Sequence, residues 1–385
     1  MIKKSIFGKI ALVVVGALII PTLAVAQIKM GIILGFTGPI ESLTPDMGKS
    51  AELAFKEVSD SGQLLGGQKV SVVRADSTCI DAAAATAAAE RLITSDKVAG
   101  IMGADCSGVT TAIANNVAVP NGVAMISPSA TSPALSTIAD NGYFFRTAPS
   151  DARQGQVLAE ITIERGINNV AVTYINNDYG KGLSDSFINS YKGLGGKVSA
   201  VVPHEADKAD FSAEVATLDA SGADVLAVFG YVDQGGNHII QGSLDAGSFD
   251  KFILADGMYG ESLLKNMDGD LTGTFGTVPG TDSKGSETFK GMAQSAGITV
   301  GGPFTGESYD AAALLMLAMQ SAGSTDRAAI ASNVFAVANA PGVKIMPGEL
   351  RKGLIILAKG GAVDYVGASN VELVGGGEAS GSYQE

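Results

Sequence analysis

Small hydroxylated side chains follow two consecutive apolar runs of the sequence, and they are well suited to hold an anion. Ser107 comes after the run Val98 to Met102, and Thr131 comes after the run Val123 to Ile126. In open α/β sheets ligands lie beyond the carboxyl ends of the strands, where a following helix presents free N–H groups and a partial positive charge. The two loops therefore predict a carboxylate site, and the alternative is that both residues only cap their own helices.

Alternating apolar runs and helical stretches predict the elements that position these loops. Strands are expected at Ile28–Gly35, Lys69–Arg74, from Val98, and at Val170–Tyr174, Lys197–Val202, Val225–Phe229 and Lys251–Leu254. Helices are expected between them at Met47–Ser59, Asp81–Ser95, Asp151–Glu164, from Gly182 to Tyr191, at Phe211–Ser221, from beyond Tyr231 to Ala246, and at Ser308–Gly323. This order predicts an α/β protein with a parallel, doubly wound sheet in each half.

The pattern restarts after Gly142–Pro149, and no linker rich in proline or serine separates the two halves. We therefore expect a hinge crossed by continuous chain and not two independent domains. The Gly- and Ser-rich tail Gly375–Glu385 is expected to be frayed.

The first 26 residues have the pattern of a cleavable secretory signal. Three lysines precede an apolar run from Ile10 to Ile20, and Ala24-Val25-Ala26 supplies small residues for cleavage after Ala26. The alternative, a membrane anchor, needs about 20 uninterrupted apolar residues, and Pro21 ends a shorter run. The sequence therefore predicts a soluble, exported protein.

Charge and cysteine content restrict the possible partners and cofactors. Loss of three lysines with the leader takes the formal net charge from −13 to −16, which argues against nucleic acid or an anionic membrane as a partner. In an oxidising compartment Cys79 and Cys106 favour one disulfide that closes a loop of about 27 residues, and two buried free thiols are the alternative. No histidine lies beside either cysteine, so the two cysteines are not expected to form a zinc site. His204 and His238 are expected at the surface without a catalytic role.

Two motifs that would indicate an enzyme or a nucleotide site are incomplete. Asp105-Cys106-Ser107-Gly108 lacks the first glycine of a G-x-S-x-G nucleophile turn. Gly48-Lys49-Ser50 lacks the earlier glycine of a phosphate-binding loop, because that position is Leu43. These motifs therefore give no support for an enzyme or a nucleotide site.

Motifs from most of the chain, taken together, resemble those of one family. They are Ile28-Lys29-Met30-Gly31 with Thr37-Gly38-Pro39, Cys79 with Cys106-Ser107, Ser127-Pro128-Ser129-Ala130-Thr131, Asn177-Asp178-Tyr179-Gly180-Lys181-Gly182, Asp210-Phe211 with Gly222-Ala223-Asp224-Val225, and Tyr309-Asp310-Ala311-Ala312. This set resembles the leucine/isoleucine/valine-binding family of type I periplasmic solute-binding proteins, which serve ABC transporters. The two cysteines fall where amino-acid-binding members have their disulfide.

The resemblance implies two lobes joined by three crossovers, with ligand closing the cleft by hinge motion. It assigns residues 1–26 to the signal peptide, 27–148 and 279–345 to the first lobe, and 149–278 and 346–385 to the second.

The resemblance also implies roles for individual residues. Ser107 and Thr131 would hold the ligand carboxylate, and Asp256 and the Ser129 carbonyl would hold its ammonium. Ala130 belongs to the same first-lobe loop, and Tyr179 and Tyr231 would line the second-lobe side. By the residues alone, Asp256 is also consistent with an ordinary turn and the tyrosines with core packing.

The function that the resemblance implies is a monomeric periplasmic receptor that delivers an amino acid to an ABC permease, without cofactor or metal. Two departures leave the ligand class open: Leu43 stands where amino-acid-binding relatives often have tyrosine, and Asp256 is shorter than a glutamate. An amide, urea or small carboxylic acid, or docking to a sensor in place of a transporter, are the alternatives.

Overall fold

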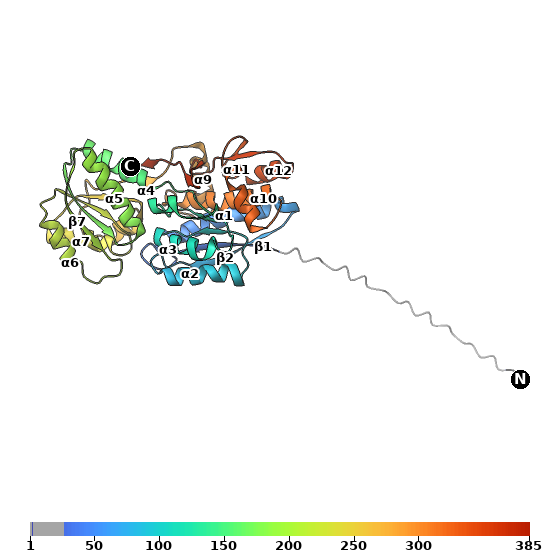
Figure 1. The fold of residues 1–385 in the computed structure, drawn as a ribbon, viewed down its shortest axis with the longest axis horizontal. Helices are drawn as coiled ribbons and strands as arrows, with labels where there is room; N and C mark the ends of the chain where they lie inside the picture. The colour runs from blue at the N-terminus through green and yellow to red at the C-terminus, as the bar shows by residue number, and fades with distance from the viewer. Residues whose placement is uncertain (1, 3–26) are drawn as a thin grey trace.

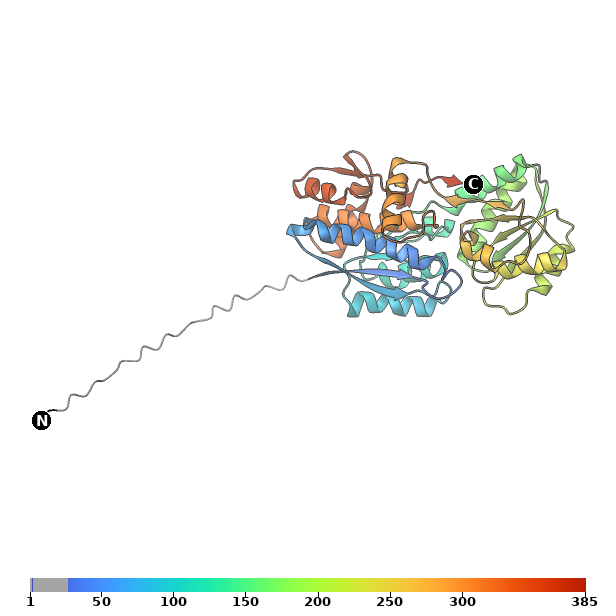
Figure 2. The same ribbon diagram turned by 180° about the vertical axis from the view of Figure 1, so that it is seen from behind.

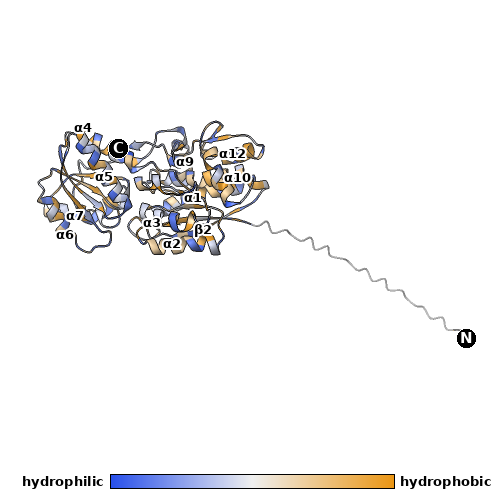
Figure 3. Cartoon of the chain, viewed as in Figure 1, coloured by the Kyte–Doolittle hydropathy of each residue, from blue (hydrophilic) through white to orange (hydrophobic). Residues whose placement is uncertain are grey.

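The computed structural model describes residue 2 and residues 27–385, so the predicted signal peptide, apart from residue 2, lies outside the described residues. Two α/β lobes lie side by side, with β1, β2 and α1 in one and α4 to α7 in the other (Figure 1). The view from behind shows the same two bodies (Figure 2). Figure 3 shows apolar strands in the interior of each lobe and polar residues on the outer helices.

The first lobe is built on a five-stranded parallel sheet in the order β2-β1-β3-β4-β5. Its strands are β1 Ile28–Leu34, β2 Val70–Asp76, β3 Ile101–Gly103, β4 Met125–Ser127 and β5 Phe144–Arg146. The helices packed with it are α1 Thr44–Ser61, α2 Ala82–Glu90, α3 Ser107–Ile113, α9 Lys284–Ser295, α10 Thr305–Ala322, α11 Arg327–Ala338 and α12 Leu350–Ala358. Because both faces are covered, β1, β3 and β4 are almost continuously apolar, whereas the edge strand β2 carries Ser71, Arg74 and Asp76.

The second lobe repeats this plan with the order β10-β9-β8-β6-β7. Its strands are β6 Asn169–Ile175, β7 Lys197–His204, β8 Val225–Phe229, β9 Phe252–Leu254 and β10 Phe275–Gly276. Its helices are α4 Asp151–Glu164, α5 Asp178–Gly193, α6 Ser212–Asp219, α7 Gly236–Ala246 and α8 Glu261–Asn266. The predicted pair of doubly wound parallel sheets is confirmed.

Three crossings of the chain join the lobes. The first leads from β5 into α4, and the second leads from β10 into β11 (Val278–Pro279). The third is the carboxyl end, where β16 (Tyr383–Gln384) pairs antiparallel with β11. The prediction of a frayed tail was wrong, because the backbone of β16 is paired and the Ser382 hydroxyl donates to the Gly280 carbonyl at 2.7 Å.

The segment after residue 345 also differs from its predicted place. Helix α12 packs against α1 and α10, and β13 (Val363–Tyr365) pairs with β12 (Val343–Ile345), all within the first lobe. A short hairpin of β14 (Leu373–Val374) and β15 (Glu378–Ala379) then contacts β5. Assigning residues 346–385 to the second lobe was therefore wrong for most of this segment, because α12 and β13 bury their apolar side chains against first-lobe helices.

His204 is buried, which corrects the prediction that it lies at the surface. It ends β7, and its Nδ1 lies 2.8 Å from the Thr173 hydroxyl of the neighbouring strand β6. Burial lowers the pKa of the imidazole to about 4, so the ring is neutral at pH 7. His238 is exposed, as expected. Within the described residues, no helix combines the length and apolar character needed to cross a membrane.

Candidate ligand-binding cleft

The two hydroxyl-rich loops of the first lobe meet at the edge of its sheet. Ser107 begins α3 directly after β3 and its loop, and its hydroxyl accepts from the backbone N–H of Ser132 at 3.1 Å. The Thr131 hydroxyl is buried beside the Asp151 carboxyl, and the Thr131 carbonyl accepts from the Asp151 N–H at 2.9 Å. The predicted carboxylate-binding residues are therefore brought together, with an acidic side chain beside one of them.

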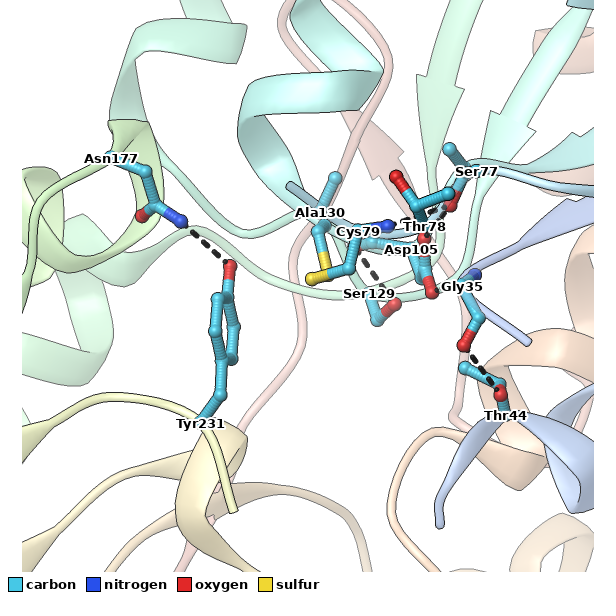
Figure 4. Close-up of a disulfide and its surroundings, with 12 residues drawn as sticks. Gly35, Thr44, Ser77, Thr78, Cys79, Asp105, Ser129, Ala130, Asn177 and Tyr231 are labelled. Atoms are coloured by element: carbon cyan, nitrogen blue, oxygen red, sulfur yellow. Dashed lines mark hydrogen bonds between the residues drawn. A yellow bond between two sulfur atoms is a disulfide. The ribbon is translucent and has the colours of Figure 1, made fainter. Parts of the chain in front are cut away.

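The disulfide between Cys79 and Cys106 fixes the base of the first loop (Figure 4). Beside it, the Asp105 carboxylate accepts from the Gly35 N–H at 2.5 Å and from the Ser77 hydroxyl at 2.9 Å. The predicted disulfide is confirmed. Because the Asp105 carboxylate is bonded on both oxygens, it serves the loop and does not face the cleft as a free charge.

Arg146 holds the second loop and was missed by the sequence analysis. Its guanidinium is fully buried at the end of β5 and donates to the carbonyls of Ala130 and Ser132 at 3.0 and 2.8 Å. It also pairs with Glu378 of the β14–β15 hairpin at 2.9 Å. The carbonyl of Ala130 is thus engaged by Arg146. The signal in the sequence that could have identified Arg146 is its position directly after two phenylalanines.

The predicted residues of the second lobe form one connected group. Tyr179 and Tyr231 stack with their ring centroids 5.3 Å apart, although they come from α5 and from the loop after β8. The Asn177 amide donates to the Tyr231 hydroxyl at 3.1 Å (Figure 4), and the Tyr179 hydroxyl donates to the Asp256 carboxylate at 2.6 Å. The Asp256 carboxylate is thus hydrogen-bonded to one of two stacked tyrosine side chains.

Asp256 lies just after β9 and is only half satisfied. Its Oδ1 also accepts from the Gly257 N–H at 2.7 Å, but no described residue bonds to its Oδ2. A side chain at position 257 would bring its Cβ within 2.6 Å of the Gly230 carbonyl oxygen, so this close approach requires glycine. Burial raises the pKa of Asp256 to about 6.

Asp151 is a second buried carboxyl that the sequence analysis missed as a site residue. It begins α4 immediately after the first crossover and is fully buried, with the Thr131 hydroxyl beside its carboxyl. Burial and the neighbouring Asp256 charge raise its pKa well above the usual range. Because the charges of Asp151 and Asp256 repel each other, the two carboxyls titrate as a coupled pair. In the ligand-free site, the pair therefore retains a proton to a higher pH than a free carboxyl does.

A small cavity lies between these groups and is lined by both lobes. It encloses about 30 Å³. Its polar lining residues are Asp105, Ser107, Ser129, Tyr179, Tyr231 and Asp256, and its apolar ones are Ile40, Leu43, Met47 and Phe304, with Cys106 of the disulfide. The lining therefore combines polar and apolar side chains.

Direct contacts between the lobes flank this cavity on two sides. The Asp233 carboxylate of the second lobe accepts from the Ser42 N–H at 2.8 Å, and the Asp233 N–H donates to the Pro39 carbonyl at 3.0 Å. On the other side, Asp178 accepts from the Thr111 hydroxyl at 3.1 Å. The lobes are thus in a closed arrangement.

The site has no arrangement for metal binding. Within the part of the chain that the structure describes, no group of three or more His, Cys, Asp or Glu side chains is placed to share an ion. Two carboxyls without a third ligand, together with hydroxyls, suit an organic ammonium and carboxylate better than a divalent ion.

Known proteins share this architecture. A family model described as periplasmic binding protein matches residues 27–349. A Leu/Ile/Val-binding protein homolog of Brucella abortus is 30% identical over 330 residues, covering 84% of this chain and 86% of that protein. The structure of a leucine-binding protein from Thermotoga maritima is similar with a TM-score of 0.78, at 24% identity, covering 92% of this chain and 94% of that one.

A solute-binding protein of an ABC transporter from R. palustris, in complex with benzoate, is also similar in fold. Its TM-score is 0.72 at 18% identity, covering 93% of this chain and 92% of that one. The extent of the family match and the identity to the Brucella protein over most of both chains show that this chain belongs to the periplasmic binding protein family, in its branched-chain amino-acid-binding branch, with the type I fold.

Proposed function

We propose that the chain is the substrate-binding protein of an ABC importer and that it binds a neutral amino acid between its lobes. The observation that carries this proposal is an unpaired buried carboxylate oxygen at a cavity that is also lined by hydroxyls and the start of a helix. Oδ2 of Asp256 has no partner, and Ser107 at the start of α3 lines the same cavity from the first lobe. A zwitterion offers an ammonium to the carboxylate and a carboxylate to the hydroxyls and the helix start.

The ammonium of the ligand is the partner that the two buried carboxyls lack. A buried carboxylate is costly unless it is paired, and here no described lysine or arginine forms a salt bridge with Asp151 or Asp256. We assign the ammonium to Asp256 and Asp151, with the Ser129 carbonyl as a further acceptor. The carboxylate is assigned to Ser107 and Thr131, where the α3 N-terminus adds a favourable dipole.

The apolar residues in the cavity lining favour a ligand with an uncharged side chain. They are Ile40, Leu43, Met47 and Phe304, and Asp105, which also lines the cavity, already accepts two hydrogen bonds. A charged ligand side chain placed here would lose its hydration without gaining a partner. Tyr179 and Tyr231 cover the ligand from the second lobe.

An aromatic carboxylate is the second candidate ligand. The stacked Tyr179 and Tyr231 offer a flat aromatic wall, and the R. palustris relative was solved with benzoate. Such a ligand has no ammonium, so it requires the Asp151–Asp256 pair to stay protonated. The two candidates therefore differ in how binding responds to pH.

The remaining parts of the proposal concern location and partners. The leader of residues 1–26 directs export and is cleaved after Ala26, and the mature monomer delivers its ligand to the permease subunits from the periplasm. The function is binding without catalysis.

The experiment that tests this proposal is thermal unfolding of residues 27–385, refolded to remove carried-over ligand, against a panel of amino acids, amides and carboxylic acids. A ligand at about 100 times its dissociation constant adds about 2.7 kcal/mol of stability, which raises the melting temperature by several degrees. Neutral amino acids are expected to shift wild type and to lose that shift in Asp256→Asn. A shift with benzoates alone supports the second candidate and contradicts the first.

A further inference from the structure

Another cavity lies beside the hinge. Its volume is about 210 Å³, and its walls include α9, the loop 299–303 and the start of α10 in the first lobe, together with parts of two crossovers. The crossover residues are Val278 to Thr281, which include β11, and Gln384 of β16. We call this space the hinge cavity. One water needs about 10–15 Å³ by this measure, so the hinge cavity has room for a small organic molecule.

Glu307 lines the hinge cavity with a carboxyl that receives no hydrogen bond from another described residue. It lies in the first turn of α10, and only 7% of its surface is exposed. The hydrogen bond that stabilises its charge comes from its own backbone N–H, and burial raises the pKa of the carboxyl to about 8. The helix dipole favours an acidic residue in this turn, but that benefit does not require burial. The charged form of Glu307 therefore lacks a partner.

The other polar groups of the lining do not supply this partner. The Thr305 hydroxyl donates to the backbone carbonyl three residues earlier at 2.8 Å, and the Ser369 hydroxyl donates to Asp310 at 2.7 Å. Lys290 of α9 also lines the cavity, but its side chain is exposed and forms no ion pair with Glu307. A cation that enters from solvent would therefore be the first direct partner of this carboxylate.

The rest of the lining suits an organic cation better than a metal ion. Tyr259, Phe289 and Phe304 line the same cavity, and the faces of aromatic rings attract ammonium groups. Among the residues that the structure describes, no group of three or more His, Cys, Asp or Glu side chains is placed to hold a metal. One carboxylate with aromatic and apolar neighbours matches an ammonium group on a short hydrocarbon chain.

The hinge cavity and the ligand-binding cleft contain different carboxyls. Glu307 does not line the small cavity beside Asp256, and Asp256 does not line the hinge cavity; Phe304 is the residue that borders both. A ligand bound to one carboxyl therefore leaves the other accessible from its own cavity, so the two sites can be tested separately.

We propose that the hinge cavity is a second binding site, for a small organic ammonium ion, with Glu307 as its charged partner. The ammonium group donates to the Glu307 carboxylate, and the hydrocarbon part packs against Phe289 and Phe304. This site goes beyond the proposed function, which assigns an amino acid to the cleft, and it does not depend on that function.

The test compares n-butylammonium with 1-butanol, an uncharged probe of the same chain length, by ligand-observed NMR titration of residues 27–385. At pH 8.5 the Glu307 carboxyl is mostly ionised, because its pKa is about 8. Wild type is expected to bind butylammonium at least about tenfold more tightly than 1-butanol. This comparison needs no variant.

Glu307→Gln keeps the shape of the side chain and removes its charge. It is expected to weaken butylammonium binding at least about tenfold and to leave 1-butanol binding unchanged. The matched control is Glu287→Gln on α9, where the side chain is exposed and does not line the cavity, so both affinities are expected to stay as in wild type. The melting temperature of each variant shows whether it is folded.

Asp256→Asn distinguishes the hinge cavity from the cleft, since a cation bound in the cleft would pair with Asp256. Butylammonium binding is expected to persist in this variant and to be lost in Glu307→Gln. The proposal is overturned if wild type binds neither probe, if it binds both equally, or if Asp256→Asn and not Glu307→Gln abolishes butylammonium binding. Failure of every amino acid to bind wild type would contradict the proposed function alone, so the two failures are distinguishable.

Discussion

Two buried aspartates in different regions of the molecule have opposite surroundings. Asp310 in α10 accepts from the Tyr365 hydroxyl at 2.7 Å, from the N–H groups of Ala368 and Ser369 at 2.8 Å each, and from the Ser369 hydroxyl at 2.7 Å. Asp256 in the cleft has one oxygen without a partner, and the second carboxyl nearby, Asp151, has the Thr131 hydroxyl beside it and no salt bridge. All three are buried, so the difference lies in what surrounds them.

The difference distinguishes Asp310, a carboxylate with a structural role, from Asp256, whose missing partner we assign to the ligand. Burial raises the pKa of Asp310 as it does that of Asp256, but four donors stabilise its charged form and tie β13 and its following loop to α10. The cleft residues lack such donors, so their charged form gains its partner only on binding. For these carboxyls, a full set of donors thus accompanies a structural role, and the missing donors accompany the proposed role in binding.

The largest expected effect is on stability at the satisfied carboxylate. Asp310→Asn replaces an acceptor with an amide that faces four donors, and we expect it to lower the free energy of unfolding by about 2–5 kcal/mol. Urea denaturation measures this change. The control is Asp219→Asn on exposed helix surface, expected within about 0.5 kcal/mol of wild type. An Asp310 variant as stable as the control would remove the contrast between the two regions.

The corresponding change in the cleft should have the opposite sign for the ligand-free protein. Asp256→Asn keeps the shape and the hydrogen bonds to Tyr179 and Gly257 but removes a buried charge that lacks a full set of partners. We expect it to raise the free energy of unfolding at pH 7 by about 1–3 kcal/mol while it weakens amino-acid binding about 100-fold or more. Urea denaturation and calorimetry provide the two measurements. Destabilisation as large as that of Asp310→Asn would mean that Asp256 is part of the scaffold.

A smaller effect is expected in the pH dependence of the ligand-free protein. The unfolded Asp256 carboxyl loses its proton near pH 4, and the folded one near pH 6, so between these values the folded state holds more protons. The contribution of this group to stability therefore falls as pH rises from 4 to 6 and is constant above. Urea denaturation between pH 4 and 7.5 should show a weaker fall in Asp256→Asn than in wild type. Equal slopes would contradict the raised pKa.

Local sequence patterns predicted most of the scaffold because each element carries its own signal. The helix Asp151–Glu164 and the strand Val225–Phe229 have the predicted bounds, and Asp81 caps α2 by accepting from Ala83 at 2.9 Å. The prediction that the tail is frayed was wrong because its order does not come from a local signal. β16 is ordered through pairing with β11, a partner about 100 residues away that the composition of the tail does not reveal.

The family motifs allowed part of the candidate site to be predicted from the sequence. Residues whose local sequence already gives them an ordinary structural role were missed. Asp151 follows Ser150, whose hydroxyl accepts from the Ala152 N–H at 3.3 Å, and an acidic residue in the first turn is what any helix favours. The approach of Asp151 to Asp256 arises only when the first crossover brings α4 beside the end of β9. Arg146 was missed likewise, since its partners Ala130 and Glu378 are brought to it by the fold.

The most direct test of the account is proton linkage on ligand binding. Calorimetry of the amino acid selected by the panel, at pH 6 in two buffers of different ionisation enthalpy, measures protons released or taken up. We predict net release, because the ligand ammonium stabilises the charged Asp151–Asp256 pair and displaces the proton that the pair retains when unliganded. Proton uptake, or no exchange at all, would contradict the claim that the ligand completes these two carboxyls.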